Sequence, residues 1–298
     1  MAIVAFVFAA ISPVVAPANP LPATALLVSS ATLALASSPV VSVPIPFAGT
    51  LYVPDDGLPH PGVLLLHGLE GGAATDRVRE ARFFASKGFA ALAFCWFGCD
   101  EPVLSIPSAP HDIDLSRTYE AFRWLRSSSY VKHKPTAIYG VSLGAQQALV
   151  LAVYLAQHPE YITPNAVVVH APSDEIQGGN PPLWTWQGDL RGLQPGSPIQ
   201  LARYSGGLLV TQGLEDSQQA VSASRKIEQR VRSAGTAVRT LVHEADPTLP
   251  PLVVEPSEPG VARMEFHYFK LEGGVFDPAM DAIRLNEVIE FLQNKLGS

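Results

Sequence analysis

The sequence predicts an α/β fold in which helices cover both faces of a doubly wound, mostly parallel sheet that carries a lid-like insertion. Residues 62–68 and 89–96 are nearly continuous apolar runs, the pattern of strands buried on both faces of a parallel sheet. Strand-like and helix-like segments alternate from Gly62 onward, which favours a doubly wound sheet. Residues 140–144 join a short apolar run to a helix-like stretch through two glycines. The rest of the chain is organised around this strand-turn-helix unit.

Length and composition limit the classes of protein that the chain can represent. It has 298 residues, of which 47% are hydrophobic and 16% charged, enough for one large α/β domain or two small ones. We assign one such domain to residues 41–298, after an uncharged leader over residues 1–40. The formal net charge of -7 argues against a nucleic-acid partner.

Neither a metal site nor a cofactor motif is recognisable in the sequence. Cys95 and Cys99 are too few for a disulfide framework, and two ligands alone do not make a zinc site. We expect two thiols packed near the end of a strand. The P-loop pattern is missing, and Gly71-Gly72 lies in the wrong context for a dinucleotide fingerprint. We therefore expect no metal and no cofactor.

The first 54 residues contain no charged side chain. Residues 3–11 resemble the hydrophobic region of a signal peptide, but the basic segment that precedes such a region is missing. Prolines interrupt the leader, and no apolar run approaches the ~20 residues of a membrane-spanning helix. We expect no membrane span. The sequence leaves open an atypical export signal and a disordered or misassigned leader, so cytoplasmic and exported locations both stay open.

Local patterns predict the remaining elements in order along the chain. Prolines within residues 41–54 favour edge strands, where a missing N–H is tolerated. Residues 113–131 carry apolar side chains roughly on one side, as in an amphipathic helix. The other predicted segments are helices over residues 74–87, 143–152, 222–234 and 282–296 and strands over residues 136–139, 166–171, 208–212 and 238–243.

Two long segments, residues 173–204 and 243–274, interrupt the alternation of strands and helices. The first is rich in Gly, Pro and Trp and follows the strand that comes after the strand-turn-helix unit. One interpretation is a lid or pocket wall, with Trp184 and Trp186 as apolar contacts for a substrate. The other is a surface loop with two packing tryptophans.

Residues 140–144 have the pattern Gly-x-Ser-x-Gly of a nucleophile elbow. A sharp turn from strand to helix forces Ser142 into a strained backbone conformation, and the two glycines remove side chains that would collide there. The Leu143 amide, at the start of the helix, points toward an oxyanion that forms at the serine. The alternative is a glycine-rich turn with an idle serine.

The segment after the first buried strand, residues 67–72, is where an α/β-hydrolase places its second oxyanion amide. Leu69 is the candidate for that amide. The alternative is a glycine-rich turn without a catalytic duty. We expect His67 to support this loop rather than to act as a base.

A serine hydroxyl needs a base, and the base needs a carboxylate that orients it. Asp216 follows a buried run and a glycine turn, with Glu215 as the second choice; the alternative for Asp216 is a helix N-cap. In an α/β-hydrolase the chain order is serine, acid, histidine. Only His243 and His267 follow Asp216, and either could instead be an ordinary strand histidine.

Together these pieces resemble the catalytic domain shared by acyl-CoA thioesterases and bile acid-CoA:amino acid N-acyltransferase, a branch close to the dienelactone hydrolases. The resemblance implies an α/β-hydrolase fold and a small-molecule acyl ester or thioester as substrate. In that family serine at the elbow accompanies thioester hydrolysis and cysteine accompanies amino-acid transfer, so Ser142 implies hydrolysis. The matching segments are residues 61–68 with 71–72, 88–98, 114–125, 139–145, 170–173 and 213–216.

One position departs from that family. Counting from residues 241–242, the place of the family's base falls on Thr248, which cannot accept a proton near neutral pH. Two hypotheses follow. The chain is a serine hydrolase whose base has moved to His243 or His267, or it is a pseudo-hydrolase that binds a ligand or partner without turnover. The oligomeric state does not follow from the sequence.

Overall fold

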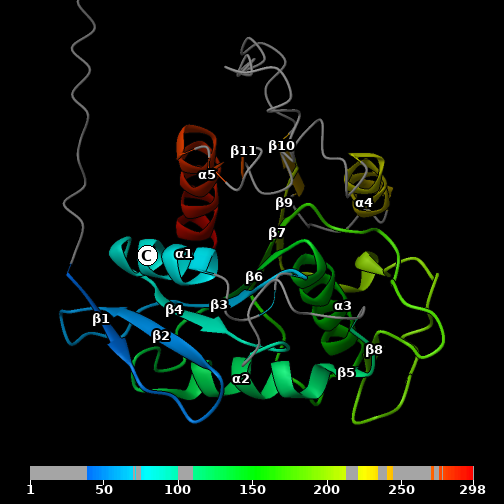
Figure 1. Cartoon of the computed structure of the whole chain (residues 1–298), viewed down its shortest axis with the longest axis horizontal. Coiled ribbons are helices and arrows are strands. Elements are labelled where there is room, and N and C mark those ends of the chain that lie inside the picture. The colour runs from blue at the N-terminus through cyan, green and yellow to red at the C-terminus, as the bar shows by residue number, and fades with distance from the viewer. Residues whose placement is uncertain are drawn as a thin grey trace, which may run out of the picture. The chain divides into compact units, whose positions relative to one another are not determined.

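The computed structural model describes residues 39–69, 71, 75–99, 110–212, 221–233, 240–243, 270–271, 275–276 and 278–297 (Figure 1). The predictions for residues 1–38 and for Glu215, Asp216, Thr248 and His267 lie outside these residues. Among the residues described, no helix combines the length and apolar character that a membrane crossing needs.

Eight strands of the described chain form one sheet in the order β1-β2-β4-β3-β6-β7-β9-β10. The pairs β1–β2 and β2–β4 are antiparallel, and all others are parallel. The mostly parallel sheet predicted from the sequence is therefore confirmed. The strands span β1 Val40–Val43, β2 Gly49–Pro54, β3 Gly62–Leu66, β4 Ala90–Phe94, β6 Thr136–Val141, β7 Ala166–His170, β9 Gly207–Thr211 and β10 Thr240–His243.

The central strands are buried on both faces because their side chains alternate between two apolar layers. In β3, Leu64 and Leu66 belong to one layer, whereas Val63 and Leu65 belong to the other. Every residue of β3, β4, β6, β7 and β9 is buried. Apolar residues at successive positions therefore satisfy both layers at once, which explains the continuous runs seen in the sequence.

Helices cover both faces of the sheet (Figure 1). Helices α1 and α5 pack on one face, and α2, α3 and α4 pack on the other. In Figure 1 the cyan α1 and the red α5 lie together, away from the green α2 and α3. The helices span α1 Thr75–Ser86, α2 Leu115–Ser127, α3 Leu143–Gln157, α4 Val221–Ser233 and α5 Pro278–Leu296.

The predicted helix over residues 113–131 is shorter than expected at both ends. It begins at Leu115 because Asp114 caps it, accepting a hydrogen bond from the Ser116 N–H at 2.9 Å. Ile113–Asp114 instead form β5, which pairs in parallel with β8, Trp184–Thr185. This two-stranded sheet joins the start of α2 to the predicted lid segment. The remaining short elements are the 3₁₀ helix Leu201–Arg203 and the pair β11 Lys270–Leu271 and β12 Val275–Phe276.

A buried ionic cluster joins α1, β6 and α5. The Glu80 carboxylate is fully buried and pairs with Arg77 and Arg284, each at 2.5 Å. The Tyr139 hydroxyl donates to Glu80 at 3.0 Å, and Arg284 donates to the same hydroxyl. Burial raises the pKa of Tyr139 above its ordinary value, so the phenol stays neutral. The cluster fixes the layer of helices behind the strand that leads into Ser142.

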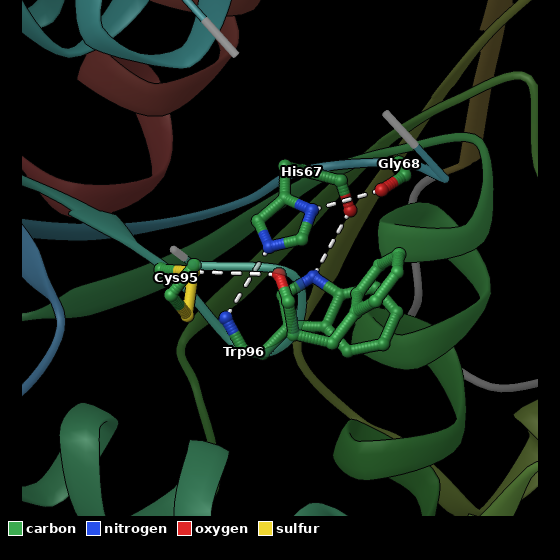
Figure 2. The surroundings of a disulfide bond; sticks show 6 residues. His67, Gly68, Cys95 and Trp96 are labelled. Atoms are coloured by element: carbon green, nitrogen blue, oxygen red, sulfur yellow. Dashed lines mark hydrogen bonds between the residues drawn. A yellow bond between two sulfur atoms is a disulfide. The ribbon is translucent and has the colours of Figure 1, made fainter. Parts of the chain in front are cut away.

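The two cysteines form a disulfide, and the expectation of two thiols is wrong. Cys95 and Cys99 are bonded directly after β4, with Cα atoms 5.8 Å apart (Figure 2). A spacing of four residues carries no clear signal of pairing in a sequence with only these two cysteines. The turn that brings the sulfurs together comes from the strand end, where Gly98 takes φ +59°.

Candidate active site

Ser142 lies at a sharp turn between β6 and α3. Its backbone has φ +55° and ψ −120°, a conformation that costs a residue with a side chain about 1–3 kcal/mol. Hydrogen bonds hold the turn on both sides. The Ser142 N–H donates to the His170 carbonyl at 2.8 Å, and the Ser142 carbonyl accepts from Ala145 and Gln146 at 2.9 and 3.1 Å. A strained serine that is held so firmly is the geometry of a nucleophile elbow.

Both glycines of the pattern are required sterically. A Cβ atom on Gly140 would lie 2.2 Å from the Gly144 carbonyl oxygen. A Cβ atom on Gly144 would lie 2.4 Å from the His67 carbonyl oxygen and 2.6 Å from that of Leu66. Helix α3 therefore approaches the end of β3 more closely than any side chain allows. This contact places the start of the nucleophile helix against the loop that was predicted to supply an oxyanion amide.

The carboxyl ends of the parallel strands meet at the edge where Ser142 stands. Val141 is in register with His170, and His170 is in register with Thr211. The His170 ring is buried and its Nδ1 lies 2.9 Å from the Thr211 hydroxyl, which ties β7 to β9 at this level. The segments over residues 72–74, 100–109, 213–220 and 244–269 lie outside the described residues.

His67 contacts the loop after β3, in agreement with the supporting role expected from the sequence. Its ring Nε2 accepts the Trp96 main-chain N–H at 3.2 Å, and its Nδ1–H donates to the Gly68 carbonyl at 2.8 Å. Both ring nitrogens are thereby engaged, which fixes one neutral tautomer. The Trp96 ring stacks on the imidazole, with centroids 4.9 Å apart. His67 is thus a structural residue beside the site.

The two predicted oxyanion amides belong to Leu143 and Leu69, which lie close in sequence to the contact between Gly144 and the end of β3. Leu143 is the first residue of α3, and amides in the first turn of a helix have no acceptor within the helix. Leu69 follows β3 by three residues, and half of its surface is exposed. The assignment of their N–H groups to an oxyanion stays a prediction.

The strand register separates His243 from Ser142. His243 ends β10 beside Thr211, so three strand spacings of about 4.8 Å, or about 14 Å, lie between it and Val141. The register fixes only this backbone separation, and the choice of base between His243 and His267 is not tested by it. The identity of the base stays a prediction.

The predicted acid falls between β9 and α4 in the sequence, and one hydrogen bond joins described residues on either side of that stretch. The Gln212 side chain, one residue after β9, accepts a hydrogen bond from the Ser224 hydroxyl at 2.9 Å. Asp216 itself lies outside the described residues. Gln212 directly follows the end of β9, which lies at the same edge of the sheet as the end of β6.

Sequence reasoning missed Gln146, which ties the predicted lid segment to the nucleophile helix. Its side chain is fully buried, and its Nε2 donates to the Glu175 carbonyl at 2.6 Å. Its Oε1 accepts from the Trp184 indole at 2.6 Å and from the Gln177 N–H at 3.2 Å. A polar residue in an otherwise apolar helix was the available signal, because a buried amide needs partners.

A second anchor holds the same segment to α4. The buried Asp174 carboxylate accepts a hydrogen bond from Arg230 at 2.8 Å and lies 3.6 Å from the Lys226 ammonium. The Arg230 guanidinium also donates to the Asp174 carbonyl at 2.7 Å. These contacts hold the start of the segment 173–204 against α4.

Trp184 and Trp186 are both buried, each with 1% of its surface exposed. Trp184 lies near Trp96, with ring centroids 5.5 Å apart, and Trp186 stacks on Tyr154 at 4.2 Å. Both therefore pack in the apolar layer between α3 and the segment 173–204. Their contact with a substrate stays a prediction.

The described residues also form a cavity of about 250 Å³ between the outer side of α3 and residues 191–200. Val150, Val153 and Tyr154 line it on the helix side, and Leu193 and Ile199 line it on the other. These positions lie two to three turns along α3 from Ser142, so the cavity is separate from the elbow.

Comparisons with known proteins agree with this geometry. No model of a described protein family matches the sequence. Over 109 residues, 37% of this chain, it is 34% identical to acyl-coenzyme A amino acid N-acyltransferase 2 of Mus musculus and covers 24% of that protein. Over 106 residues, 36% of this chain, it is 31% identical to acyl-coenzyme A thioesterase 2, mitochondrial, of Mus musculus and covers 22% of that protein.

The chain is a distant homologue of these acyl-CoA enzymes. It spans about a quarter of the length of the curated relatives that it matches. A solved structure of a dienelactone hydrolase from Anabaena variabilis superposes with a TM-score of 0.53 and 18% identity, covering 87% of this chain and 97% of that chain. The likeness confirms the α/β-hydrolase fold. The resemblance to acyl-CoA thioesterases, stated from sequence motifs, is confirmed as distant homology.

Proposed function

We propose that the protein is a serine hydrolase that cleaves an acyl ester or thioester through an acyl-enzyme on Ser142. The observation that carries this proposal is the strained, clamped backbone of Ser142 between β6 and α3. Strain of this kind persists where the surrounding structure holds it and serves a function. The homology to proteins named as thioesterases supports the choice of substrate class.

The proposed reaction has two acyl-transfer steps. The Ser142 hydroxyl attacks the acyl carbonyl while a histidine takes its proton, and the amides of Leu69 and Leu143 hold the oxyanion. Asp216 orients the histidine and stabilises its cation. The protonated histidine then gives its proton to the departing alcohol or thiol. A water molecule, activated by the same histidine, releases the acid from the serine.

His267 is the better candidate for the base. The register of β10 keeps His243 about 14 Å from the strand end that carries Ser142. Only these two histidines follow Asp216 in the sequence. His267 follows β10 in the sequence, so the register of that strand does not fix its distance from the serine. The corresponding experiment is a comparison of the variants His243→Ala and His267→Ala.

A second candidate function rests on Thr248, which occupies the family's base position. If no histidine replaces that base, the protein is a pseudo-hydrolase that binds an acyl ligand or a partner without turnover. Loss of a triad base lowers turnover by several orders of magnitude, although oxyanion stabilisation leaves some residual activity.

Labelling with a fluorophosphonate separates the two functions. We expect one adduct, located on Ser142 by peptide mass and absent from the variant Ser142→Ala. His267→Ala should slow labelling at least a hundredfold, whereas His243→Ala should change it less than threefold. Wild-type protein that is folded by circular dichroism and takes no label contradicts the hydrolase and supports the binding protein.

A further inference from the structure

The loop over residues 95–99 is a short covalent ring at the carboxyl end of β4. Cys95 is nearly buried, with 9% of its surface exposed, and Cys99 is half-buried. The disulfide between them encloses Trp96, Phe97 and Gly98. Such a ring limits the positions that the Trp96 side chain and main-chain amide can take.

Trp96 holds His67 through three contacts, two of which Figure 2 shows as dashed lines. Its main-chain N–H donates to the imidazole Nε2 at 3.2 Å, and its indole N–H donates to the His67 carbonyl at 3.0 Å. Its ring stacks on the imidazole at 4.9 Å with an interplanar angle of 14°. Phe97 adds a second ring, whose centroid lies 5.2 Å from that of the imidazole. The ring and the carbonyl of His67 are thus both held by the disulfide-closed loop.

His67 passes this constraint to the neighbouring loop. Its Nδ1–H donates to the Gly68 carbonyl at 2.8 Å, one residue before the predicted oxyanion residue Leu69 (Figure 2). The His67 carbonyl also lies where a Cβ atom on Gly144 would come within 2.4 Å of it. The residue held by Trp96 therefore contacts both the oxyanion loop and the nucleophile helix.

We propose that the disulfide-closed loop Cys95–Cys99, acting through Trp96 and His67, positions the oxyanion loop, so that reduction of this disulfide slows acyl transfer to Ser142. The inference rests on the proposed function. Trp96 is a positioning residue, because it contacts His67 and not the reacting atoms.

The redox step is thiol–disulfide exchange with a small dithiol reductant. A thiolate of the reductant attacks one sulfur of the Cys95–Cys99 bond and forms a mixed disulfide, while the other protein sulfur leaves and takes a proton. The second thiol of the reductant then displaces the first protein sulfur. The protein gains two electrons and two protons as a dithiol, and the reductant becomes a cyclic disulfide. An oxidised dithiol reverses the step.

The test compares oxidised and reduced protein, with the redox state of each sample confirmed by intact mass after thiol alkylation. Loss of an oxyanion amide costs a hundredfold or more, and reduction loosens the loop without removing the amide. We therefore expect fluorophosphonate labelling of Ser142 to slow about tenfold on reduction, or ~1.4 kcal/mol. We also expect faster hydrogen exchange in the peptide over residues 64–71, with α2 peptides unchanged.

Two sets of variants separate positioning from general damage. The double variant Cys95→Ser with Cys99→Ser should label as slowly as reduced wild type and should not respond to dithiol. Trp96→Phe keeps the disulfide, the main-chain N–H and an aromatic ring, but loses the indole donor. It should label about twofold to tenfold more slowly, the effect of one neutral hydrogen bond. Trp124→Phe, on α2, is the matched control and should label as the wild type does.

Equal labelling rates of fully oxidised and fully reduced wild type would overturn the inference. Slower labelling on reduction in the double serine variant as well would also overturn it, because the effect would then lie outside the disulfide. If neither form is labelled, the proposed function fails and hydrogen exchange decides alone. Faster exchange of the peptide over residues 64–71 in the reduced form then supports the positioning role, and unchanged exchange contradicts it.

Discussion

The contact between Gly144 and the end of β3 makes the substitution Gly144→Ala a sharp test of the elbow. The added methyl carbon would lie 2.4 Å from the His67 carbonyl oxygen and 2.6 Å from the Leu66 carbonyl oxygen. Both atoms belong to the backbone, so no side-chain rotation relieves the overlap. Helix α3 must move away from β3, or the loop after β3 must move away from the helix.

The expected magnitude follows from these distances. Relief of the overlap requires a shift of about 1 Å between the Leu143 and Leu69 sides of the proposed oxyanion site, and a misplacement of 1 Å can cost a hundredfold in rate. Forced overpacking of a buried contact costs about 1–3 kcal/mol in the free energy of unfolding. We therefore expect Gly144→Ala to label about a hundredfold more slowly. We expect its free energy of unfolding to fall by about 1–3 kcal/mol.

The assay measures the fluorophosphonate labelling rate together with the urea midpoint of unfolding. Gly179→Ala is the matched control, because a Cβ atom there meets nothing within 4 Å. It should leave both quantities unchanged. A Gly144→Ala protein that labels as fast as the wild type would refute the argument that this close approach positions the site.

The remaining predictions concern the buried polar groups. Glu80→Gln should lower the free energy of unfolding by about 3–5 kcal/mol in urea denaturation, because the buried Arg284 guanidinium loses its carboxylate; a change below 1 kcal/mol contradicts this. Gln146→Leu should lower the free energy of unfolding by about 2–4 kcal/mol because it removes three hydrogen bonds, and Trp184→Phe should lower it less because it removes one. Equal decreases in melting temperature for the two variants would contradict the role of Gln146 in holding residues 175–184 to α3. Burial raises the pKa of Tyr204 above its ordinary value of 10.0, so the folded protein keeps a proton that the unfolded chain releases. The resulting contribution to the free energy of unfolding is present below pH 10 and is lost as the pH rises above it. Urea denaturation between about pH 10 and 12 should therefore show a less steep loss of stability for Tyr204→Phe than for the wild type.

The sheet was predictable because its central strands carry an unusually direct signal. Residues 62–66 and 90–94 fill two apolar layers, so every position is apolar and the strands stand out from the helices. Boundaries were less certain. The start of α2 moved to Leu115 because Asp114 caps the helix locally, while Ile113 and Asp114 pair as β5 with β8, about seventy residues away in the chain.

The disulfide and the Gln146 anchor were not predictable for a different reason. Both depend on contacts that the residues themselves do not specify. Cys95 and Cys99 come together through a local turn that neither residue specifies, and Gln146 meets partners about thirty to forty residues away in the chain. A sequence shows that a buried polar group needs partners but does not name them.

The geometry of the elbow was predictable because its steric requirement is local. Ser142, Gly140 and Gly144 lie within five residues, and their steric requirement follows from the turn alone. The base is a long-range property. His243 and His267 are separated by a segment whose path the pattern of residues does not set, so the pattern does not decide between them.

The most direct test of the account is detection of the acyl-enzyme itself. Purified protein is mixed with a p-nitrophenyl ester or an acyl-CoA, quenched within milliseconds to seconds, and analysed by intact and peptide mass. We predict one acyl group on Ser142, formed in a burst that matches the enzyme concentration and missing from Ser142→Ala. A folded wild type that shows no acyl adduct, or a burst that persists in Ser142→Ala, contradicts the central claim.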